Sequence, residues 1–131
     1  MIHVDTNVII DILNNRTAFV AKSMAALANI PQGRAFIGPL VYAELAGGYA
    51  TRDALNGAIA PFNFQRAEMS DDALFHAAQA YRRYLERGGT RASILPDFFI
   101  GAHAASMGAA LLTRDPRRYR TAFPDLTLIE P

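Results

Sequence analysis

Four acidic residues stand out because of where they fall relative to the apolar segments of the chain: Asp5, Glu44, Asp97 and Asp115. The three aspartates each follow a short, mostly apolar stretch. In open α/β sheets, ligands bind outside the carboxyl ends of the strands, so these aspartates are candidates for one crevice. Glu44 falls on an expected helix, about 60° around it from Val41, at the edge of the buried stripe. We therefore expect the four carboxylates to share a site.

Carboxylates that share a crevice need a positive partner. Two of them 4 Å apart repel by roughly 4 kcal/mol at an effective dielectric constant of 20. The only lysine, Lys22, is far from all four in the sequence. Oxygen ligands alone suit a hard cation, Mg²⁺ or Mn²⁺. Such an ion activates water and stabilises charge on a phosphoryl oxygen, so the set predicts a metal-dependent nuclease that hydrolyses phosphodiester bonds.

Each acid also has an ordinary structural explanation. The three aspartates all precede possible helix starts, where aspartate is a good N-cap. Asp115 and Pro116 form a common turn pair, and Glu44 fits a solvated helix position. The hypothesis of a metal site therefore rests on the set of four and not on any one member.

Length and composition limit the alternatives. The chain has 131 residues, 51% of them hydrophobic, which suits one compact domain with a real core. The absence of cysteine excludes disulfide scaffolds, thiolate zinc sites, iron–sulfur clusters and a cysteine nucleophile. The N-terminus does not read as a signal peptide, and no apolar run approaches the roughly 18 to 20 residues of a membrane span. We expect a soluble, cytoplasmic protein without membrane association.

The elements that must position the acids alternate between strands and helices. Strands are expected at 2–4, 35–38, 62–64, 109–113 and 126–129. Helices are expected at 6–14, 18–30, from Pro39 onward, and at 51–60, 70–87 and 97–107. The last of these is apolar or small almost all round, which is typical of a buried helix. The alternation predicts an α/β fold with a mostly parallel sheet.

Four motifs resemble the PIN-domain family, especially the VapC-like toxin ribonucleases of type II toxin–antitoxin systems. They are VDTNVII at 4–10, YAEL at 42–45, LPDFFIGAHA at 95–104 and LLTRDPRRY at 111–119. Each motif is short, but the four occur in the right order over nearly the full length. The resemblance implies a PIN-like three-layer fold, in which a short, mostly parallel sheet is flanked by helices, and a single nuclease domain spanning 1–131.

The resemblance also implies roles for individual residues. Asp5, Glu44 and Asp97 would be metal ligands, and Asp115 would complete the site directly or through water. Thr6 and Thr113 match hydroxyl positions beside the metal, although capping or a strand-end hydrogen bond explains them equally well. The implied activity is Mg²⁺-dependent endoribonuclease activity, with Mn²⁺ able to substitute.

The partners implied by the resemblance are an RNA substrate and a VapB-like antitoxin. The antitoxin's C-terminal segment typically lies in a groove that leads to the acidic site. The family also implies a homodimer, or a larger complex with the antitoxin.

Arginine provides 12 of the 13 basic residues, and four arginines crowd into 114–120. Arginine suits bidentate contacts with phosphate. Arg91, Arg114, Arg117 and Arg118 are therefore candidates for RNA binding, with Arg87 as a further member of the path. A solvated turn in an arginine-rich protein is the alternative.

Histidine and aromatic residues are weaker candidates. A metal-free ribonuclease would need two histidines as acid and base, but His103 is expected to be structural, and His3 and His76 fall on a buried strand and on the long helix. Tyr81 and Tyr84, together with Phe75, are expected in core or dimer packing.

Other functions stay open. An aspartyl-phosphate phosphatase with Asp5 as nucleophile would want an acid at position 7, which is asparagine, and a lysine near the phosphate. A binding module without catalysis does not need all four acids. Cleavage of DNA by the same metal chemistry is compatible with the sequence.

Overall fold

The structure, a computed structural model, describes residues 1–90 and 95–131. Within these residues, five strands form one sheet: β1 (Ile2–Val4), β2 (Ala35–Ile37), β3 (Gln65–Arg66), β4 (Ala110–Leu112) and β5 (Leu128–Ile129). The strand order is β3-β2-β1-β4-β5, and every neighbouring pair is parallel. The expected α/β class is therefore confirmed. Because the strands are parallel, their carboxyl ends all lie at the same edge of the sheet.

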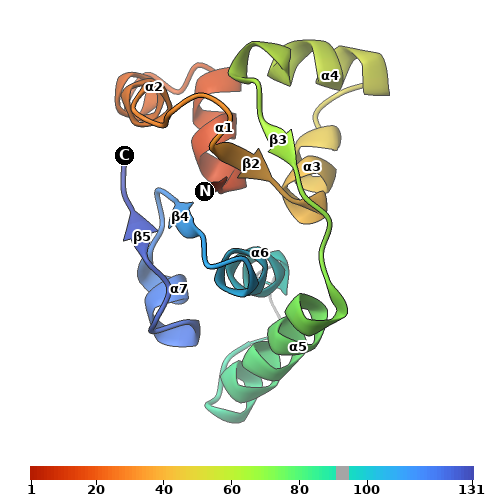
Figure 1. The fold of residues 1–131 in the computed structure, drawn as a ribbon, viewed down its shortest axis with the longest axis vertical. Coiled ribbons are helices and arrows are strands. Elements are labelled where there is room, and N and C mark those ends of the chain that lie inside the picture. The colour runs from red at the N-terminus through yellow and green to blue at the C-terminus, as the bar shows by residue number, and fades with distance from the viewer. Residues whose placement is uncertain (91–94) are drawn as a thin grey trace.

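Helices cover both faces of this sheet. The described chain contains α1 (Thr6–Leu13), α2 (Val20–Ala28), α3 (Pro39–Ala46), α4 (Arg52–Ile59), η1 (a 3-10 helix, Ala60–Phe62), α5 (Asp71–Glu86), α6 (Leu95–Ser106) and α7 (Arg117–Ala122). Helices α1 and α2 lie on one side of the sheet, and α5, α6 and α7 lie on the other (Figure 1). This arrangement gives the three layers that were expected.

Helix starts follow the local signals in the sequence. Ser70 caps α5, because its hydroxyl accepts a hydrogen bond from the Ala73 N–H at 3.1 Å. Pro39 is the first residue of α3, where its missing N–H costs no hydrogen bond. Gly88 follows α5 with a φ of 87°, a left-handed conformation that ends helices.

One expected strand was misplaced, and one helix was not expected. The strand expected at 62–64 lies later, at Gln65–Arg66, because Pro61 sits in η1 and Asn63 then turns the chain with a φ of 52°. The rings of Phe62 and Phe64 stack on each other before β3 begins. Helix α7 was not foreseen, because its arginines read as a solvated turn.

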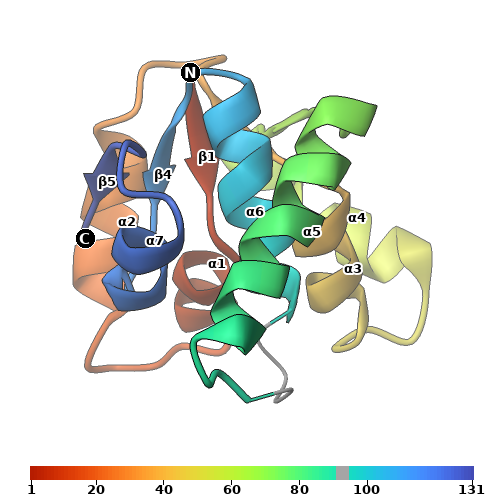
Figure 2. The same cartoon turned by 90° about the horizontal axis from the view of Figure 1, so that it is seen from below.

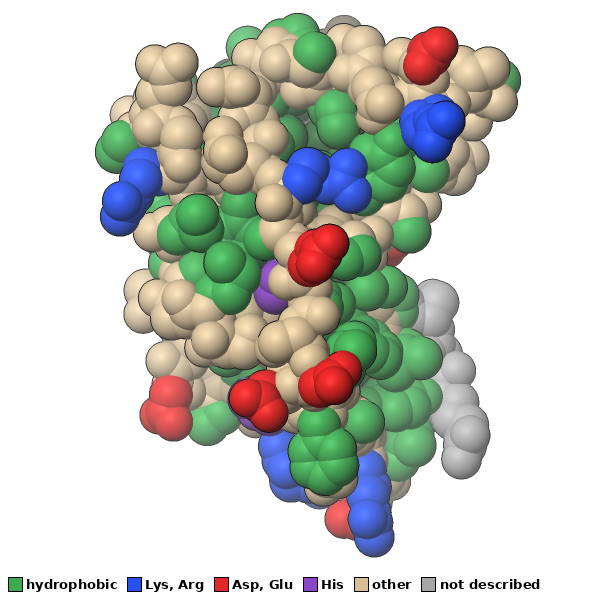
Figure 3. Space-filling model, turned by 45° about the vertical axis from the view of Figure 1, so that its right-hand side comes forward, with side chains coloured by type: hydrophobic (Ala, Val, Ile, Leu, Met, Phe, Trp, Pro, Cys, Tyr) green, Lys and Arg blue, Asp and Glu red, His purple; other side chains and the backbone are tan. Residues whose placement is uncertain are grey.

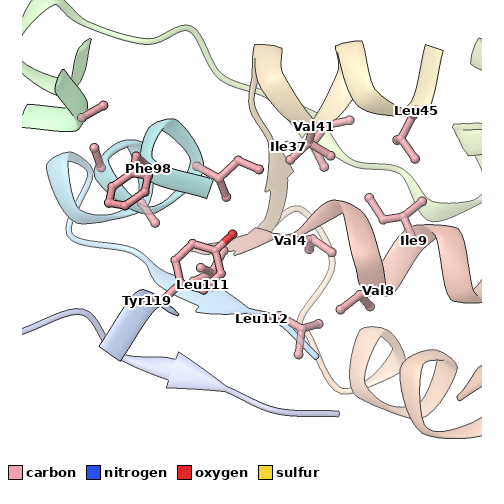
Figure 4. Close-up of a cluster of buried hydrophobic side chains, with 14 of the residues drawn as sticks. Val4, Val8, Ile9, Ile37, Val41, Leu45, Phe98, Leu111, Leu112 and Tyr119 are labelled. Carbon is pink, nitrogen blue, oxygen red and sulfur yellow. The ribbon is translucent and has the colours of Figure 1, made fainter. Parts of the chain in front are cut away.

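The core lies between β1, β4 and the helices on either side. Figure 2 shows α6 running alongside β1, with α5 packed outside it. The buried side chains of Val4, Leu111 and Leu112 project from the sheet toward the helices, and Phe98 of α6 and Tyr119 of α7 close the layer (Figure 4). The acidic edge of the sheet is thereby held by packed elements.

No helix in the described part of the chain is long and apolar enough to cross a membrane.

Candidate functional site

Asp5 stands at the centre of the site, in the turn between β1 and α1. Its backbone is extended, and its Oδ1 accepts a hydrogen bond from the Thr6 N–H at 2.7 Å. Its Oδ2 accepts hydrogen bonds from the Thr113 hydroxyl at 2.8 Å and from the Tyr119 hydroxyl at 2.9 Å. The residue is only 4% exposed. Asp5 is thus the N-cap of α1, as the structural explanation predicted. It is also a buried carboxylate whose orientation is fixed by hydrogen bonds.

The pKa of Asp5 is raised, because burial disfavours the charged carboxylate and the charge of Asp115 adds to that effect. Hydrogen bonds from Thr113, Tyr119 and the Thr6 N–H act in the opposite direction. The site therefore holds a carboxylate in surroundings that compensate its charge only in part.

Glu44 reaches the same region from α3. Its Oε1 accepts a hydrogen bond from the Thr6 hydroxyl at 2.8 Å. Desolvation raises the pKa of Glu44, the hydrogen bond from Thr6 opposes this shift, and the charge of Asp5 adds to it. Thr6 therefore links Asp5, through its N–H, to Glu44, through its hydroxyl.

Asp97 lies in the first turn of α6. Burial raises its pKa to about 6, and the negative charges of Asp5, Glu44 and Asp115 contribute, while Arg118 opposes the shift. Nη1 of Arg118 donates a hydrogen bond to Oδ2 of Asp97 at 2.5 Å. Because the three other acids all influence Asp97, the four predicted carboxylates share one electrostatic neighbourhood.

Asp115 follows β4 on the exposed side of this group. Its N–H donates to the Thr113 hydroxyl at 3.1 Å, so Thr113 connects the backbone of Asp115 with the carboxylate of Asp5. Asp115 also lines a surface cleft of about 380 Å³ between the end of α5 and α7. Both predicted threonines therefore make hydrogen bonds within the acidic group.

Two residues of the site were missed by the sequence interpretation. Nδ2 of Asn7 lies 3.4 Å from Oδ2 of Asp5 and 3.3 Å from the Thr113 hydroxyl, and its Oδ1 accepts from the Arg114 N–H at 3.1 Å. Tyr119 is 2% exposed and donates to Asp5. A single aromatic residue among the arginines of 117–120 was the available signal for an inward-facing helix position.

The candidate arginines occupy different environments. Arg114 pairs with the fully buried Asp11, its Nε lying 2.5 Å from Oδ2, and its guanidinium lies over the ring of Phe19. Arg117 and Arg118 line the cleft beside Asp115. Arg91 lies outside the described residues. The guanidinium of Arg114 thus has a structural role, which leaves Arg117 and Arg118 as the described candidates that face the cleft.

His103 is buried within the fold, as expected for a structural histidine. Its Nε2 lies 3.0 Å from the carbonyl oxygen of Glu68, and its ring packs edge-on against His3 and Phe36. Burial lowers the pKa of His103 and lowers that of His3 to about 3. Both rings are therefore neutral near pH 7.

The donor set fits a hard divalent cation in its chemistry, because all four side chains offer carboxylate oxygen. In the structure, other side chains donate hydrogen bonds to carboxylates of this set. Within residues 1–90 and 95–131, no group of three or more acidic, histidine or cysteine side chains is placed to hold a metal ion. Arg118 engages Asp97, and Thr6 engages Glu44.

Comparisons with known proteins identify the family and the fold. The family model of the PIN domain matches residues 2–124. No curated protein matches the sequence. Among solved structures, VapBC2 from Rickettsia felis bound to a promoter DNA fragment is 20% identical, with a TM-score of 0.74 over 100% of this chain and 99% of that chain. VapBC-1 from nontypeable Haemophilus influenzae is 23% identical, with a TM-score of 0.74 over 99% of this chain and 98% of that one.

A third similar structure is FitAcB from Neisseria gonorrhoeae, which is 22% identical, with a TM-score of 0.74 over 98% of this chain and 96% of that one. At these identities the likeness establishes the fold, over nearly the whole length of both chains.

Proposed function

The chain belongs to the PIN domain family, and on that premise we propose that it is a divalent-metal-dependent endoribonuclease, the toxin of a toxin–antitoxin pair. We propose that residues 1–131 form its single nuclease domain. The observation that carries the proposal is the hydrogen-bonded group around Asp5, in which Thr6 joins Asp5 to Glu44 and Thr113 joins Asp5 to the backbone of Asp115. The charges of these three acids also raise the pKa of Asp97.

Asp5, Glu44 and Asp97 are the proposed ligands of a Mg²⁺ ion, which Mn²⁺ can replace, and Asp115 completes the set directly or through water. When bound, such an ion lowers the pKa of a coordinated water and neutralises negative charge on a phosphoryl oxygen. The chain itself prepares the ligands. Thr113, Tyr119 and the Thr6 N–H fix both oxygens of Asp5 in orientation, and such supporting hydrogen bonds raise metal affinity.

A VapB-like antitoxin is the proposed partner, because the similar structures named above include VapBC assemblies. A groove of about 290 Å³ between α1 and α3 supports this proposal. Its walls include the apolar side chains of Ile10, Leu13 and Leu45, and Glu44 also lines it. A groove with apolar walls and an acid of the site in its lining suits an antitoxin segment that carries both apolar and basic residues.

A homodimer, or a larger complex with the antitoxin, is also proposed. Hydrophobic side chains gather in a band on the face shown in Figure 3, which is the side of the molecule that carries α3, α4 and α5. Phe75 on α5 is 68% exposed and Leu74 is 39% exposed, so neither belongs to the core. Tyr81 and Tyr84, in contrast, pack against Phe98.

The phosphatase alternative is less well supported. That chemistry would want an acid two residues after Asp5, whereas position 7 is Asn7, whose amide side chain hydrogen-bonds Thr113 and the N–H of Arg114. Lys22 lies on α2, apart from the acidic group. A trapped phosphoenzyme would restore this alternative.

Parallel assays on RNA and DNA of one sequence decide between the two nucleic acids, and we expect RNA to be cleaved.

Expression in bacteria without an antitoxin tests the toxin proposal. We expect the wild-type chain to arrest growth and Asp97→Ala to be harmless at the same protein level, because the variant lacks one proposed metal ligand. Asp53→Ala, which changes an exposed acid on α4, should remain toxic. Equal growth with the wild type and Asp97→Ala would contradict the proposal.

Asp97 is a better target for this test than Asp5. Removing the carboxylate of Asp5 would leave the buried hydroxyls of Thr113 and Tyr119 without their acceptor, and each such group costs about 1–3 kcal/mol. Asp5→Ala should therefore abolish activity as well, but its interpretation requires a check that the variant is folded.

A further inference from the structure

Arg118 lies between the acidic group and the cleft at the end of α5. Its guanidinium donates to Asp97 at 2.5 Å, and the two side chains are 44% and 29% exposed. Ion pairs with this degree of exposure contribute little to folding stability. The need to hold the fold together therefore does not explain the contact.

The adjoining cleft, about 380 Å³ in volume, is rich in guanidinium groups. Arg87, Arg117 and Arg118 line it together with Asp115 and the ring of Tyr84. Among the described residues, neither Arg87 nor Arg117 takes part in an ion pair. Guanidinium groups bind phosphate through paired hydrogen bonds. The cleft therefore suits the phosphate groups of a nucleic acid that passes over the acidic site.

Arg118 is the member of this set that touches both places. It lines the cleft, yet its hydrogen bond goes to a proposed metal ligand. A divalent cation bound by the carboxylates would compete with Arg118 for Asp97 and would repel the guanidinium. A phosphate in the cleft would attract the same guanidinium. Cation binding and phosphate binding thus both favour movement of Arg118 in one direction, from Asp97 into the cleft.

We infer that Arg118 is a residue with two positions: it pairs with Asp97 until a divalent cation binds to the acidic group, and it then turns into the cleft and binds a phosphate of the RNA. This inference rests on the proposed function. The cation and the RNA then bind cooperatively. Each of them draws Arg118 away from Asp97, and the pairing with Asp97 is the position that disfavours both. By linkage, the factor by which the cation tightens RNA binding equals the factor by which RNA tightens cation binding.

The first test measures cation binding without RNA. Mn²⁺ is titrated into the wild type, Arg118→Gln and Arg120→Gln by calorimetry. Arg120 is the matched control, since it lies on the same helix but pairs with Glu130. We expect Arg118→Gln to bind Mn²⁺ about two- to five-fold more tightly than the other two, the range that corresponds to an exposed ion pair. Equal or weaker binding by Arg118→Gln, or no binding by any variant, overturns the inference.

The second test measures binding of a fluorescent mixed-sequence RNA by anisotropy, in EDTA and in Ca²⁺, with gels to show that the RNA stays intact. We expect Ca²⁺ to tighten RNA binding by the wild type and Arg120→Gln, and to tighten it less for Arg118→Gln. In Ca²⁺, the slope of log binding constant against log salt concentration should be shallower by about 0.7 for Arg118→Gln than for the wild type. This is the value expected for the loss of one phosphate contact on a single strand. An unchanged cation effect in Arg118→Gln overturns the inference.

The two failures are distinguishable. If the wild type cleaves RNA but Arg118→Gln keeps wild-type affinities for Mn²⁺ and RNA, the proposed function survives and the role of Arg118 is wrong. If no variant binds or cleaves RNA, the proposed function fails, and the phosphate position of Arg118 fails with it. Thermal unfolding of the three proteins shows whether each substitution leaves the fold intact.

Discussion

Asp97 illustrates how the neighbours of a residue change its chemistry. Burial and three nearby carboxylates raise its pKa to about 6 from the ordinary 3.8. At pH 7 the group is therefore mostly ionised, but it is held at an energetic disadvantage that a bound cation would relieve. As a proposed metal ligand, Asp97 would bind a divalent ion with an affinity that depends on pH near neutrality.

The pH dependence of stability follows from the sign of this shift. A carboxyl whose pKa is higher in the folded state stabilises the fold when protonated, and this contribution is lost as the pH rises from about 4 through 6. Urea unfolding in EDTA should show the wild type losing on the order of 2 kcal/mol between pH 4 and pH 7 relative to Asp97→Asn. Parallel pH profiles for the two proteins would contradict the raised pKa.

Tyr119 is a positioning residue for Asp5. Tyr119→Phe removes one donor from Oδ2 of Asp5 and leaves the ring in place. We expect a loss of about 1 kcal/mol in stability and roughly ten-fold weaker Mn²⁺ binding, as is typical when a supporting hydrogen bond is removed from a metal ligand. Calorimetry and urea unfolding measure the two effects.

The control for this substitution is Tyr42→Phe, which removes a hydroxyl that bonds Asn56 at the surface. The control should bind Mn²⁺ like the wild type. If both variants bind equally well, the hydroxyl of Tyr119 does not position Asp5.

At the scale of elements, the turn after β4 is tied to α1 by an ion pair in which the acid is buried and the arginine is partly exposed. Asp11 of α1 is fully buried and meets Arg114 at 2.5 Å, and Arg114 directly precedes Asp115 in the chain. The backbone N–H of Arg114 also donates to the side chain of Asn7. Helix α1 and the end of β4 are thereby fixed relative to each other, and with them Asp5 and Asp115.

Removing one partner of this pair should be costly. Asp11→Asn removes two charge-assisted hydrogen bonds from Arg114, whose side chain stays 31% exposed to solvent, and we expect a loss of about 2 kcal/mol in the free energy of unfolding. The double variant Asp11→Asn with Arg114→Gln should lose less than the sum of the single variants, because the two residues act as a unit. Additive losses in urea unfolding would show that the pair is not coupled.

Sequence patterns predicted most elements, because caps, prolines and apolar periodicity act locally. They misplaced β3, because η1 and the turn at Asn63 delay the strand, and they missed α7, whose inward-facing Tyr119 has a distant partner. Tyr119 of α7 faces inward, where its ring joins the core and its hydroxyl meets Asp5, 114 positions away in sequence. The pairing of Asp11 could not be predicted for the same reason, since its partner, Arg114, is 103 positions away.

At the scale of the whole molecule, the parallel sheet explains why distant acids meet. Asp5 follows β1 and Asp115 comes shortly after β4, and these two strands are neighbours in the sheet. The type and order of the elements in sequence predicted this edge as a site. The strand order could not be predicted, because it is set by pairing between strands that are distant in sequence. The contact between Arg118 and Asp97 could not be predicted either, because it depends on the packing of α7 against α6.

Cleavage of RNA by the purified chain tests the central claim most directly. A labelled mixed-sequence RNA is incubated with the wild type and with Asp97→Asn, in Mg²⁺, in Mn²⁺ and in EDTA. The account predicts internal cleavage by the wild type with either cation, no cleavage in EDTA, and a loss of at least about a hundred-fold in rate for a folded Asp97→Asn. Cleavage that persists in EDTA or in Asp97→Asn, or intact RNA in every lane, would contradict it.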